Sequence, residues 1–213
     1  MKAFIFDMDG VIIDSEPIHL HVMQQVMNKH NISVPLELFE QYTGMTSSAV
    51  FAALIKRYNL PGTPQQMTAE HMAAFKRYIV EHNIQPIKGI RSLLAQLNER
   101  GIAAAIASSS PLDVIEFVTE QFNIKDCFKF LTSGEDVANG KPAPDIYLTT
   151  AQKLSLPPRE CVVLEDSRNG SIAAKEAGMY CIGFVNPNSG NQDLSHADET
   201  VNDIAAINLD KLF

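Results

Sequence analysis

Short apolar runs recur along the chain, and polar residues follow each of them. Continuous apolar runs of this length suit strands that are buried on both faces of a parallel sheet. Five runs therefore predict five strands, at residues 3–6, 102–107, 128–131, 161–164 and 180–185.

Amphipathic stretches lie between the later runs. Leu93, Leu94 and Leu97 recur at helical spacing, and Gly101 suits the end of that helix. The same kind of pattern predicts four helices, at residues 91–100, 111–122, 144–154 and 171–177. Strands that alternate with helices predict a doubly wound, Rossmann-like α/β core with a parallel sheet.

The first connection departs from this alternation, because residues 7–101 are far too many for an ordinary crossover. Mixed apolar and polar faces predict helices at 18–29, 47–58 and 69–82, with Gly62-Thr63-Pro64 separating the last two. We therefore expect an inserted α-helical cap domain at 15–82 and a core domain made of 1–14 and 83–213. An insert at this position would lie over the carboxyl ends of the strands, where open α/β sheets bind ligands.

The composition of the chain argues against several classes of partner and site. The chain has 213 residues, with 17 Lys and Arg against 25 Asp and Glu, a formal charge of −8. This acidic balance argues against a nucleic-acid partner, although local cations can still bind an anionic substrate. No apolar run approaches the roughly 20 residues that span a bilayer. The three cysteines are far apart and suggest neither a disulfide framework nor a zinc site. We expect core packing for Cys161 and Cys181, a cytoplasmic location and a monomer.

Paired acids follow two of the predicted strands. Asp7 and Asp9 come directly after the first, and Glu165 and Asp166 come directly after the fourth. Carboxylates beside a buried strand are costly unless they are paired or bind a metal, and Mg²⁺ prefers such oxygen ligands. The alternatives are a surface turn for the first pair and an acidic helix start for the second.

Hydroxyls and a lysine follow the other predicted strands. Ser108 stands at the end of the second strand, where a hydroxyl and neighbouring N–H groups suit a phosphate oxygen. For Ser110 we favour a different role, as the N-cap of the helix that begins at Pro111. Lys141 lies between Gly140 and Pro142, so it is well placed to neutralise a phosphate, the alternative being a solvated loop lysine.

These strand ends converge on one crevice of a doubly wound sheet. Together they offer acids for a metal, a nucleophile, a proton donor and a cationic clamp, which are the parts that phosphoryl transfer requires.

The same residues resemble the motifs of the haloacid dehalogenase superfamily, in its β-phosphoglucomutase-like and sugar-phosphate phosphatase branch with a helical cap. The resemblance covers nearly the whole chain, and it rests on Asp7-Met8-Asp9-Gly10-Val11, Ala107-Ser108, Lys141-Pro142 and Glu165-Asp166-Ser167.

The resemblance implies a role for each of these residues. Asp7 would be the nucleophile that forms an aspartyl-phosphate, and Asp9 would be the general acid and base. Mg²⁺ would be held by Asp7, the backbone carbonyl of Asp9 and Asp166, with Glu165 as a supporting ligand. The implied phosphate-binding residues are Ser108, Ser109 and Lys141.

The resemblance leaves the choice between hydrolysis and a mutase reaction to other residues. A sugar-phosphate mutase of this branch holds a second phosphate with a cap arginine and a core lysine, but the matching positions here are Ser47 and Pro111. We therefore expect hydrolysis of a small phosphorylated sugar or polyol, with the mutase as the alternative. A phospho-accepting receiver domain fits the insert and the Asp7-x-Asp9 spacing poorly, and a pure interaction protein leaves the motifs unexplained. The candidate substrate contacts of the cap are His19, Gly44, Met45 and Thr46.

Overall fold

A six-stranded parallel sheet forms the centre of the core of this protein. The computed structural model describes residues 1–35, 38 and 47–213. Its strands lie in the order β3-β2-β1-β4-β5-β6, and all neighbours are parallel. Their bounds are β1 Ala3–Phe6, β2 Ala103–Ser108, β3 Phe130–Ser133, β4 Cys161–Glu165, β5 Tyr180–Phe184 and β6 Glu199–Val201. The predicted doubly wound α/β fold is confirmed.

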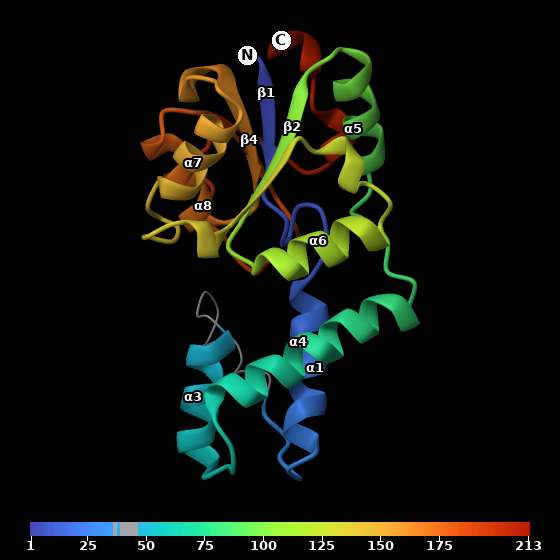
Figure 1. Cartoon of the computed structure of the whole chain (residues 1–213), viewed down its shortest axis with the longest axis vertical. Coiled ribbons are helices and arrows are strands. Elements are labelled where there is room, and N and C mark those ends of the chain that lie inside the picture. Colours follow the sequence, from blue (N-terminus) through green and yellow to red (C-terminus); the bar gives the residue numbers. More distant parts are fainter. Residues whose placement is uncertain (36–37, 39–46) are drawn as a thin grey trace. The chain divides into compact units, whose positions relative to one another are not determined.

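Helices cover both faces of this sheet (Figure 1). Helices α5 (Ile90–Glu99) and α6 (Leu112–Gln121) lie on one face, and α7 (Asp145–Lys153) and α8 (Arg168–Glu176) lie on the other. Right-handed crossovers explain the change of face, because the chain reverses its direction across the sheet after β3. The connections of β1 and β4 consequently leave in opposite directions, and this switch point is where such sheets bind ligands.

The strands form because their side chains are apolar on both faces. Phe4, Ile5 and Phe6 of β1 have no exposed surface, and Cys161 and Cys181 are buried in the same core, as expected. The face beneath α7 and α8 is built from Ala3, Ile5, Ala107, Ile146, Tyr147, Ala151, Cys161, Val163, Ala173, Ala174, Ala177, Met179 and Cys181.

One strand, β6, was not predicted from the pattern of apolar runs. The prediction of five strands was wrong, because β6 adds a sixth beside β5. Its three residues Glu-Thr-Val are partly or fully exposed, so no apolar run marks them. The third strand also begins two positions later than predicted, at Phe130. An edge strand has a solvated side, and this explains why hydrophobicity alone locates it poorly.

The chain divides into two compact units. We call Met1–Ser15 with Gln85–Phe213 the core unit, and Glu16–Ile84 the helical unit. The helices of the latter include α1 (Glu16–Asn28), α3 (Ser47–Tyr58) and α4 (Pro64–Glu81). Helix α4 begins earlier than the predicted residue 69, because Thr63 and Gln66 form a capping box and Pro64 occupies the first turn.

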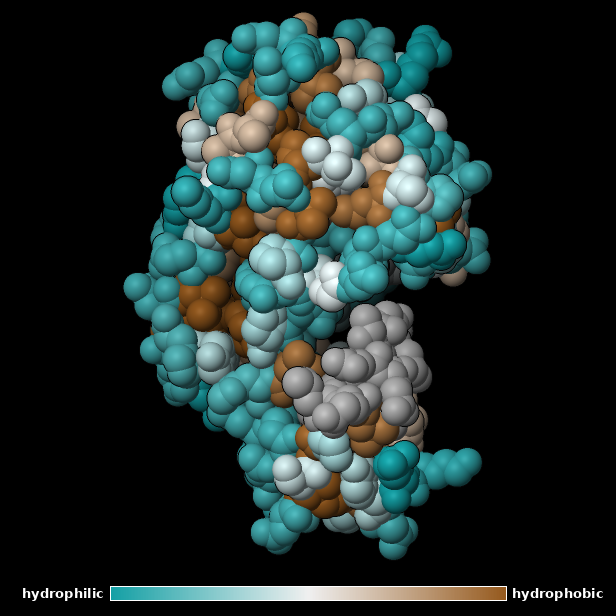
Figure 2. All heavy atoms as spheres, turned by 180° about the vertical axis from the view of Figure 1, so that it is seen from behind, coloured by the Kyte–Doolittle hydropathy of each residue, from teal (hydrophilic) through white to brown (hydrophobic). Residues whose placement is uncertain are grey.

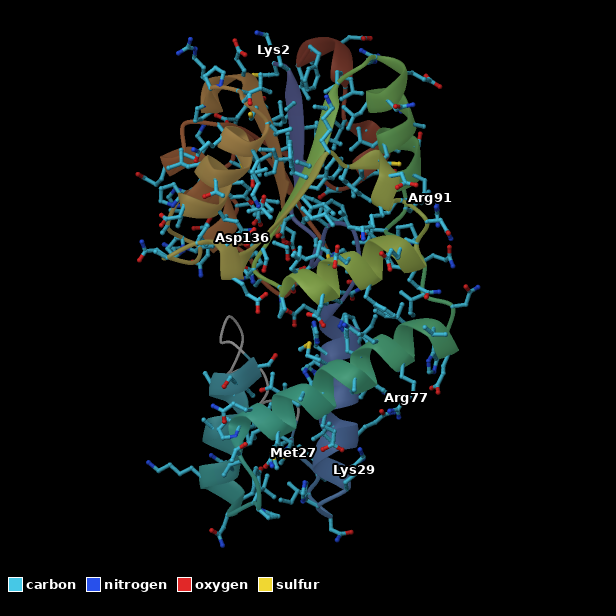
Figure 3. All side chains as sticks on the ribbon, in the orientation of Figure 1. Lys2, Met27, Lys29, Arg77, Arg91 and Asp136 are labelled. Atoms are coloured by element: carbon cyan, nitrogen blue, oxygen red, sulfur yellow. The ribbon has the colours of Figure 1, made fainter. Side chains whose placement is uncertain are left out.

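The helical unit has a hydrophobic core of its own. Met27 is buried in this core (Figure 3). Lys29, two residues further along the chain, forms an ion pair with Glu70 of α4. The core consists of Met23, Val26, Met27, Val34, Leu38, Val50, Phe51, Leu54, Leu60 and Met67.

Two histidines, the partly buried His19 and the buried His71, join α1 to α4 in the same unit. The ring of His19 stacks on Phe75 at 4.3 Å between centroids and lies 5.1 Å from the ring of His71. His71 is only 1% exposed, and its Nε2 lies 3.4 Å from the backbone oxygen of His19. The Nδ1 atom of His71 has no hydrogen-bond partner, so a proton there would be poorly solvated.

We expect acid to destabilise the helical unit through His71. Burial, and then the neighbouring His19, lower the pKa of His71 from 6.5 to about 4. Because the folded pKa is below the unfolded one, this stabilisation is complete above pH 6.5 and is lost as the pH falls toward 4. The shift corresponds to roughly 3 kcal/mol of unfolding free energy.

Hydrogen exchange of the amides of the helical unit, compared at about pH 8 and about pH 5, measures this loss. After correction for intrinsic exchange, His71→Gln should remove most of the difference, whereas the same change at the exposed His82 should leave it. Equal acid sensitivity in all three proteins would show that His71 is not responsible.

The face shown in Figure 2 carries mainly hydrophilic residues. On the face shown in Figure 2, hydrophobic residues appear in patches between hydrophilic ones. Among the residues that the structure describes, the exposed large apolar side chains come from separate elements and from near the two ends of the chain, namely Met1, Val80, Leu112, Phe130, Leu148, Val185 and Phe213. Within the described residues, no helix combines the length and the apolar character needed to cross a membrane.

Candidate active site

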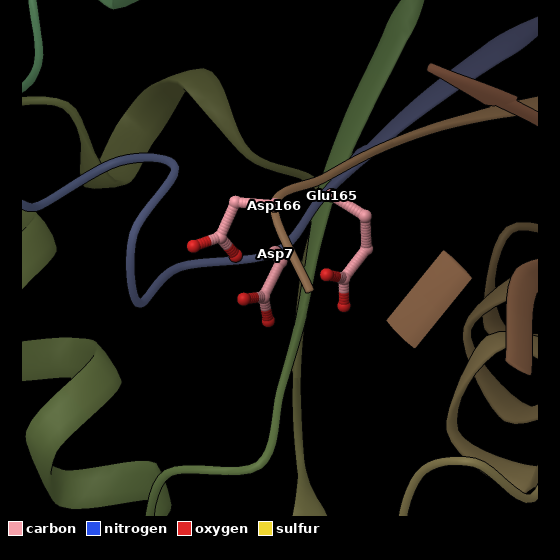
Figure 4. Close-up of side chains that lie close together, drawn as sticks. All are labelled: Asp7, Glu165 and Asp166. Atoms are coloured by element: carbon pink, nitrogen blue, oxygen red, sulfur yellow. The ribbon is translucent and has the colours of Figure 1, made fainter. Parts of the chain in front are cut away.

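Three carboxylates meet at the switch point of the sheet. Asp7 follows β1, Glu165 ends β4, and Asp166 follows it. One oxygen from each lies within 4.8 Å of the others, and all three residues are buried (Figure 4). Phe6 pairs in register with Leu164, so the neighbouring strands end at the same level and bring their acids together.

Lys141 reaches these acids from the loop that precedes α7. Its side chain is only 8% exposed, with Nζ 2.8 Å from Asp7 Oδ1 and 2.5 Å from Glu165 Oε1. Nζ also donates to the backbone oxygen of Ala107 at 3.3 Å. The alternative of a solvated loop lysine is therefore wrong, because this ammonium group is almost completely enclosed by acceptors.

The charges of this cluster are unbalanced. Burial raises the pKa of Asp7 to about 7 and that of Asp166 to about 8. Burial also opposes ionisation of Glu165, but the charge and hydrogen bond of Lys141 hold the pKa of Glu165 below its usual value. One ammonium group therefore faces three acids. A divalent cation with a preference for oxygen would balance the remaining charge, so the donor set fits such an ion.

Glu165 is the best-anchored of the three acids. Its Oε1 accepts from Lys141 and, at 2.9 Å, from the hydroxyl of Tyr147. Its Oε2 accepts from the backbone N–H and the hydroxyl of Ser167, both at 2.9 Å. Gly170 of α8 makes room for the carboxylate, because a Cβ atom there would lie 1.6 Å from Oε1. With two donors on each oxygen, Glu165 is suited to hold Lys141 and the start of α8 in place.

Asp9 lies beside Ser108, the last residue of β2, and beside Ser110, which follows that strand. Ser110 Oγ donates to Asp9 Oδ2 at 2.7 Å, and Ser108 Oγ lies 3.4 Å from the same atom. The predicted role of Ser110 as an N-cap is wrong. Helix α6 is capped one residue later, at Pro111, without a side-chain bond. The Ser110 side chain can therefore turn toward the site, and its backbone N–H donates to Ser108 Oγ.

The structure describes two of the remaining predicted residues, Ser109 and His19. Ser109 is exposed, and its backbone packs against Gly134 at the end of β3. His19 packs against Phe75 inside the helical unit. Three further candidates lie outside the described residues, namely Gly44, Met45 and Thr46.

Tyr147 is a residue that sequence reasoning missed. It lies on α7, has no exposed surface, and directs its hydroxyl to Glu165. Lys141 Nζ lies 5.0 Å from the centre of its ring, within the range of a cation–π contact. The available signal was weak, because a tyrosine on the apolar face of a helix usually indicates core packing.

This combination of a doubly wound sheet with clustered acids and an enclosed lysine at its switch point is typical of an enzyme active site. The chain belongs to the haloacid dehalogenase-like hydrolases, whose family model matches residues 4–184.

Several known proteins are similar to this chain along most of its length. A probable pseudouridine-5'-phosphatase of Drosophila melanogaster is 31% identical over 210 residues, covering 94% of this chain and 89% of that protein. Hexitol phosphatase B of Escherichia coli K12 is 35% identical over 190 residues, covering 89% and 86%. CbbY of Rhodobacter sphaeroides, crystallised with xylulose 1,5-bisphosphate, has a TM-score of 0.87 and 26% identity, covering 97% and 96%.

Proposed function

We propose that this protein is a Mg²⁺-dependent phosphatase that hydrolyses small sugar or polyol phosphates through an aspartyl-phosphate on Asp7. The observation that carries the proposal is the enclosed carboxylate of Asp7. It lies 2.8 Å from Lys141 Nζ, in a cluster with Glu165 and Asp166. The membership of a hydrolase family and the phosphatase names of the relatives support the same reaction.

The residues present fit a Mg²⁺ ion. Asp7 and Asp166 would supply carboxylate oxygens, and the resemblance adds the backbone carbonyl of Asp9. The oxygens of Glu165 already accept four hydrogen bonds from the protein. Glu165 would therefore be a supporting rather than a principal ligand of the ion. When bound, the ion neutralises negative charge on the phosphoryl oxygens and on Asp7.

The first half of the reaction transfers the phosphoryl group to the enzyme. An oxygen of Asp7 forms a bond to phosphorus, and the bond from phosphorus to the substrate oxygen breaks. Asp9 gives its proton to that leaving oxygen, which departs as an alcohol. Lys141 and Ser108 hold the phosphoryl oxygens, and Ser110 keeps the carboxyl group of Asp9 oriented through its 2.7 Å hydrogen bond.

The second half releases phosphate. Asp9, now ionised, takes a proton from water as the water oxygen attacks phosphorus. The bond between phosphorus and Asp7 breaks, which restores the Asp7 carboxylate and yields inorganic phosphate. One residue thus acts as acid and then as base.

The substrate class follows from the relatives rather than from contacts in this chain. A hexitol phosphatase, a pseudouridine-5'-phosphatase and a protein bound to a pentulose bisphosphate have polyhydroxylated phosphate esters in common. We extend this class to the present chain. The mutase alternative would need a second phosphate site, for which Ser47 and Pro111 offer no cation.

One assay separates the two reactions. The purified chain would be given β-glucose 1-phosphate with a trace of glucose 1,6-bisphosphate, and hexose and hexitol 6-phosphates in parallel, each with Mg²⁺ or with EDTA. Free phosphate and glucose 6-phosphate would both be measured. We expect Mg²⁺-dependent release of phosphate without isomerisation. Rapid formation of glucose 6-phosphate would instead identify a mutase.

Removing one hydroxyl should weaken the reaction measurably. We expect Tyr147→Phe to lower kcat by roughly 10-fold, the scale of one hydrogen bond to a charged group, because Glu165 then holds Lys141 less firmly. Phosphate-release kinetics measure this loss. Thr150→Val is the matched control, since its buried hydroxyl bonds only within α7, to Ile146. Equal rates in the two variants would contradict a positioning role for Tyr147.

A further inference from the structure

A loop outside the four motifs touches the acid cluster. After β5 ends at Phe184, residues 186–190 carry the sequence Asn-Pro-Asn-Ser-Gly. Ser189 in this loop donates its hydroxyl hydrogen to Oδ2 of Asp166 in a short hydrogen bond. Both side chains are enclosed, because Ser189 is 8% exposed and Asp166 is 6% exposed. A fifth strand end thereby contributes to the site.

The same loop is fastened to the segment that follows β1. Asn186 Nδ2 donates to the backbone oxygen of Gly10 at 2.9 Å and to Asp14 Oδ1 at 3.3 Å. Asn188 Nδ2 donates to Asp14 Oδ2 at 2.5 Å, and its backbone N–H donates to Asn186 Oδ1 at 2.9 Å. These bonds place Ser189 on a supported loop rather than on a loosely held one.

Gly10 completes the enclosure of Asp166. Its φ of +75° is in the left-handed region, and a Cβ atom there would lie 1.9 Å from Asp166 Oδ2 and 2.9 Å from Ser189 Oγ. Oδ2 of Asp166 is therefore close to both the glycine backbone and the serine hydroxyl. With Oδ2 engaged in this way, the rotation of the carboxylate about its Cβ–Cγ bond is restricted.

We propose that Ser189 is a positioning residue that orients the carboxylate of Asp166 for the cation. The inference rests on the proposed function, because it takes Asp166 as a Mg²⁺ ligand. A residue that hydrogen-bonds to a metal ligand orients that ligand and strengthens the binding of the metal. No bond to Mg²⁺ itself is required of the serine.

Metal affinity is the measurement that separates this role from simple packing. Calorimetry with Mg²⁺ should show roughly 10- to 100-fold weaker binding by Ser189→Ala, the range typical when such a partner is lost. Ser189→Thr, which keeps the hydroxyl, should restore most of the affinity. Raising the Mg²⁺ concentration should recover much of the phosphatase rate of Ser189→Ala, since the nucleophile is intact.

Two further variants, Ser171→Ala and Asp166→Asn, make the result decisive. Ser171→Ala removes another buried hydroxyl, which bonds only to the Arg168 backbone in α8, and it should bind Mg²⁺ like the wild type. Urea unfolding without metal should give similar midpoints for Ser189→Ala and Ser171→Ala. Asp166→Asn should lose Mg²⁺ binding.

The outcomes distinguish the two proposals. A wild-type chain that binds no Mg²⁺ overturns the proposed function and this inference with it. A wild-type chain that binds Mg²⁺, with equal affinity in Ser189→Ala or with no recovery in Ser189→Thr, overturns only the role of Ser189.

Discussion

Asp7→Asn should abolish phosphate release. The amide is not a nucleophile, so no bond to phosphorus can form, and the loss should be roughly 10⁶-fold, as when a covalent hydrolase loses its nucleophile. Asparagine has the shape of aspartate, so substrate can still bind. Phosphate release under saturating substrate and Mg²⁺, measured against a no-enzyme blank, gives the result.

This variant should lose activity without losing stability. The pKa of Asp7 is raised to about 7 by burial, so the folded chain already tolerates a neutral group at this position. Urea unfolding without metal should therefore give a midpoint no lower than that of the wild type. Asp198→Asn is a suitable control, because Asp198 pairs with Lys175 away from the acid cluster and should leave turnover unchanged. Substantial turnover by a folded Asp7→Asn protein would remove Asp7 from the mechanism.

Asp9→Asn should slow hydrolysis of a sugar phosphate by roughly 10²- to 10⁴-fold. Without a proton donor, the substrate oxygen must leave as a high-energy alkoxide. Without a base, water attacks the aspartyl-phosphate less readily. Both halves of the reaction should therefore be slower. With an alcohol as the leaving group, the loss of the proton donor slows the transfer of the phosphoryl group to Asp7 directly.

The role of Asp9 as proton donor can be checked with a substrate whose leaving group needs no proton. Nitrophenolate leaves without needing a proton, so Asp9→Asn should still form the aspartyl-phosphate from p-nitrophenyl phosphate. Stopped-flow absorbance should then show a burst of nitrophenolate followed by slow turnover. A variant that loses activity equally on both substrates, with no burst, would argue that Asp9 serves the phosphoryl group or the metal rather than proton transfer.

Much of the fold and of the acid cluster was predictable from the sequence. Strands β1 and β4 are apolar on both faces, which makes buried parallel strands the easiest elements to recognise. Once those strands are parallel neighbours, Asp7 and Glu165 must lie at the same edge of the sheet. Lys141 bonds to Asp7 across 134 positions of sequence, and the topology explains why they meet.

The other residues of the site could not be predicted, because their roles depend on the direction of their side chains. The spacing of residues along the sequence does not reveal that direction. A shift of the α6 cap by one residue turns Ser110 from a presumed cap into a partner of Asp9. Tyr147 resembles any core aromatic until its hydroxyl is seen to meet Glu165. Ser189 belongs to a polar loop whose composition predicts only a turn. In each case a hydroxyl gains its role from a neighbour distant in sequence.

In the proposed reaction, Asp7 carries the phosphoryl group during turnover, and this intermediate can be detected directly. We would mix the chain with Mg²⁺ and a hexitol 6-phosphate, quench with acid during turnover, and map the modified peptide by mass spectrometry. Asp9→Asn would be treated in parallel, because slower breakdown should raise the amount of intermediate. We predict one phosphoryl group on the peptide that contains Asp7, and none in Asp7→Asn. Hydrolysis of the same substrate by the wild type and by Asp9→Asn, with that peptide unmodified in both, would show that Asp7 does not carry the phosphoryl group.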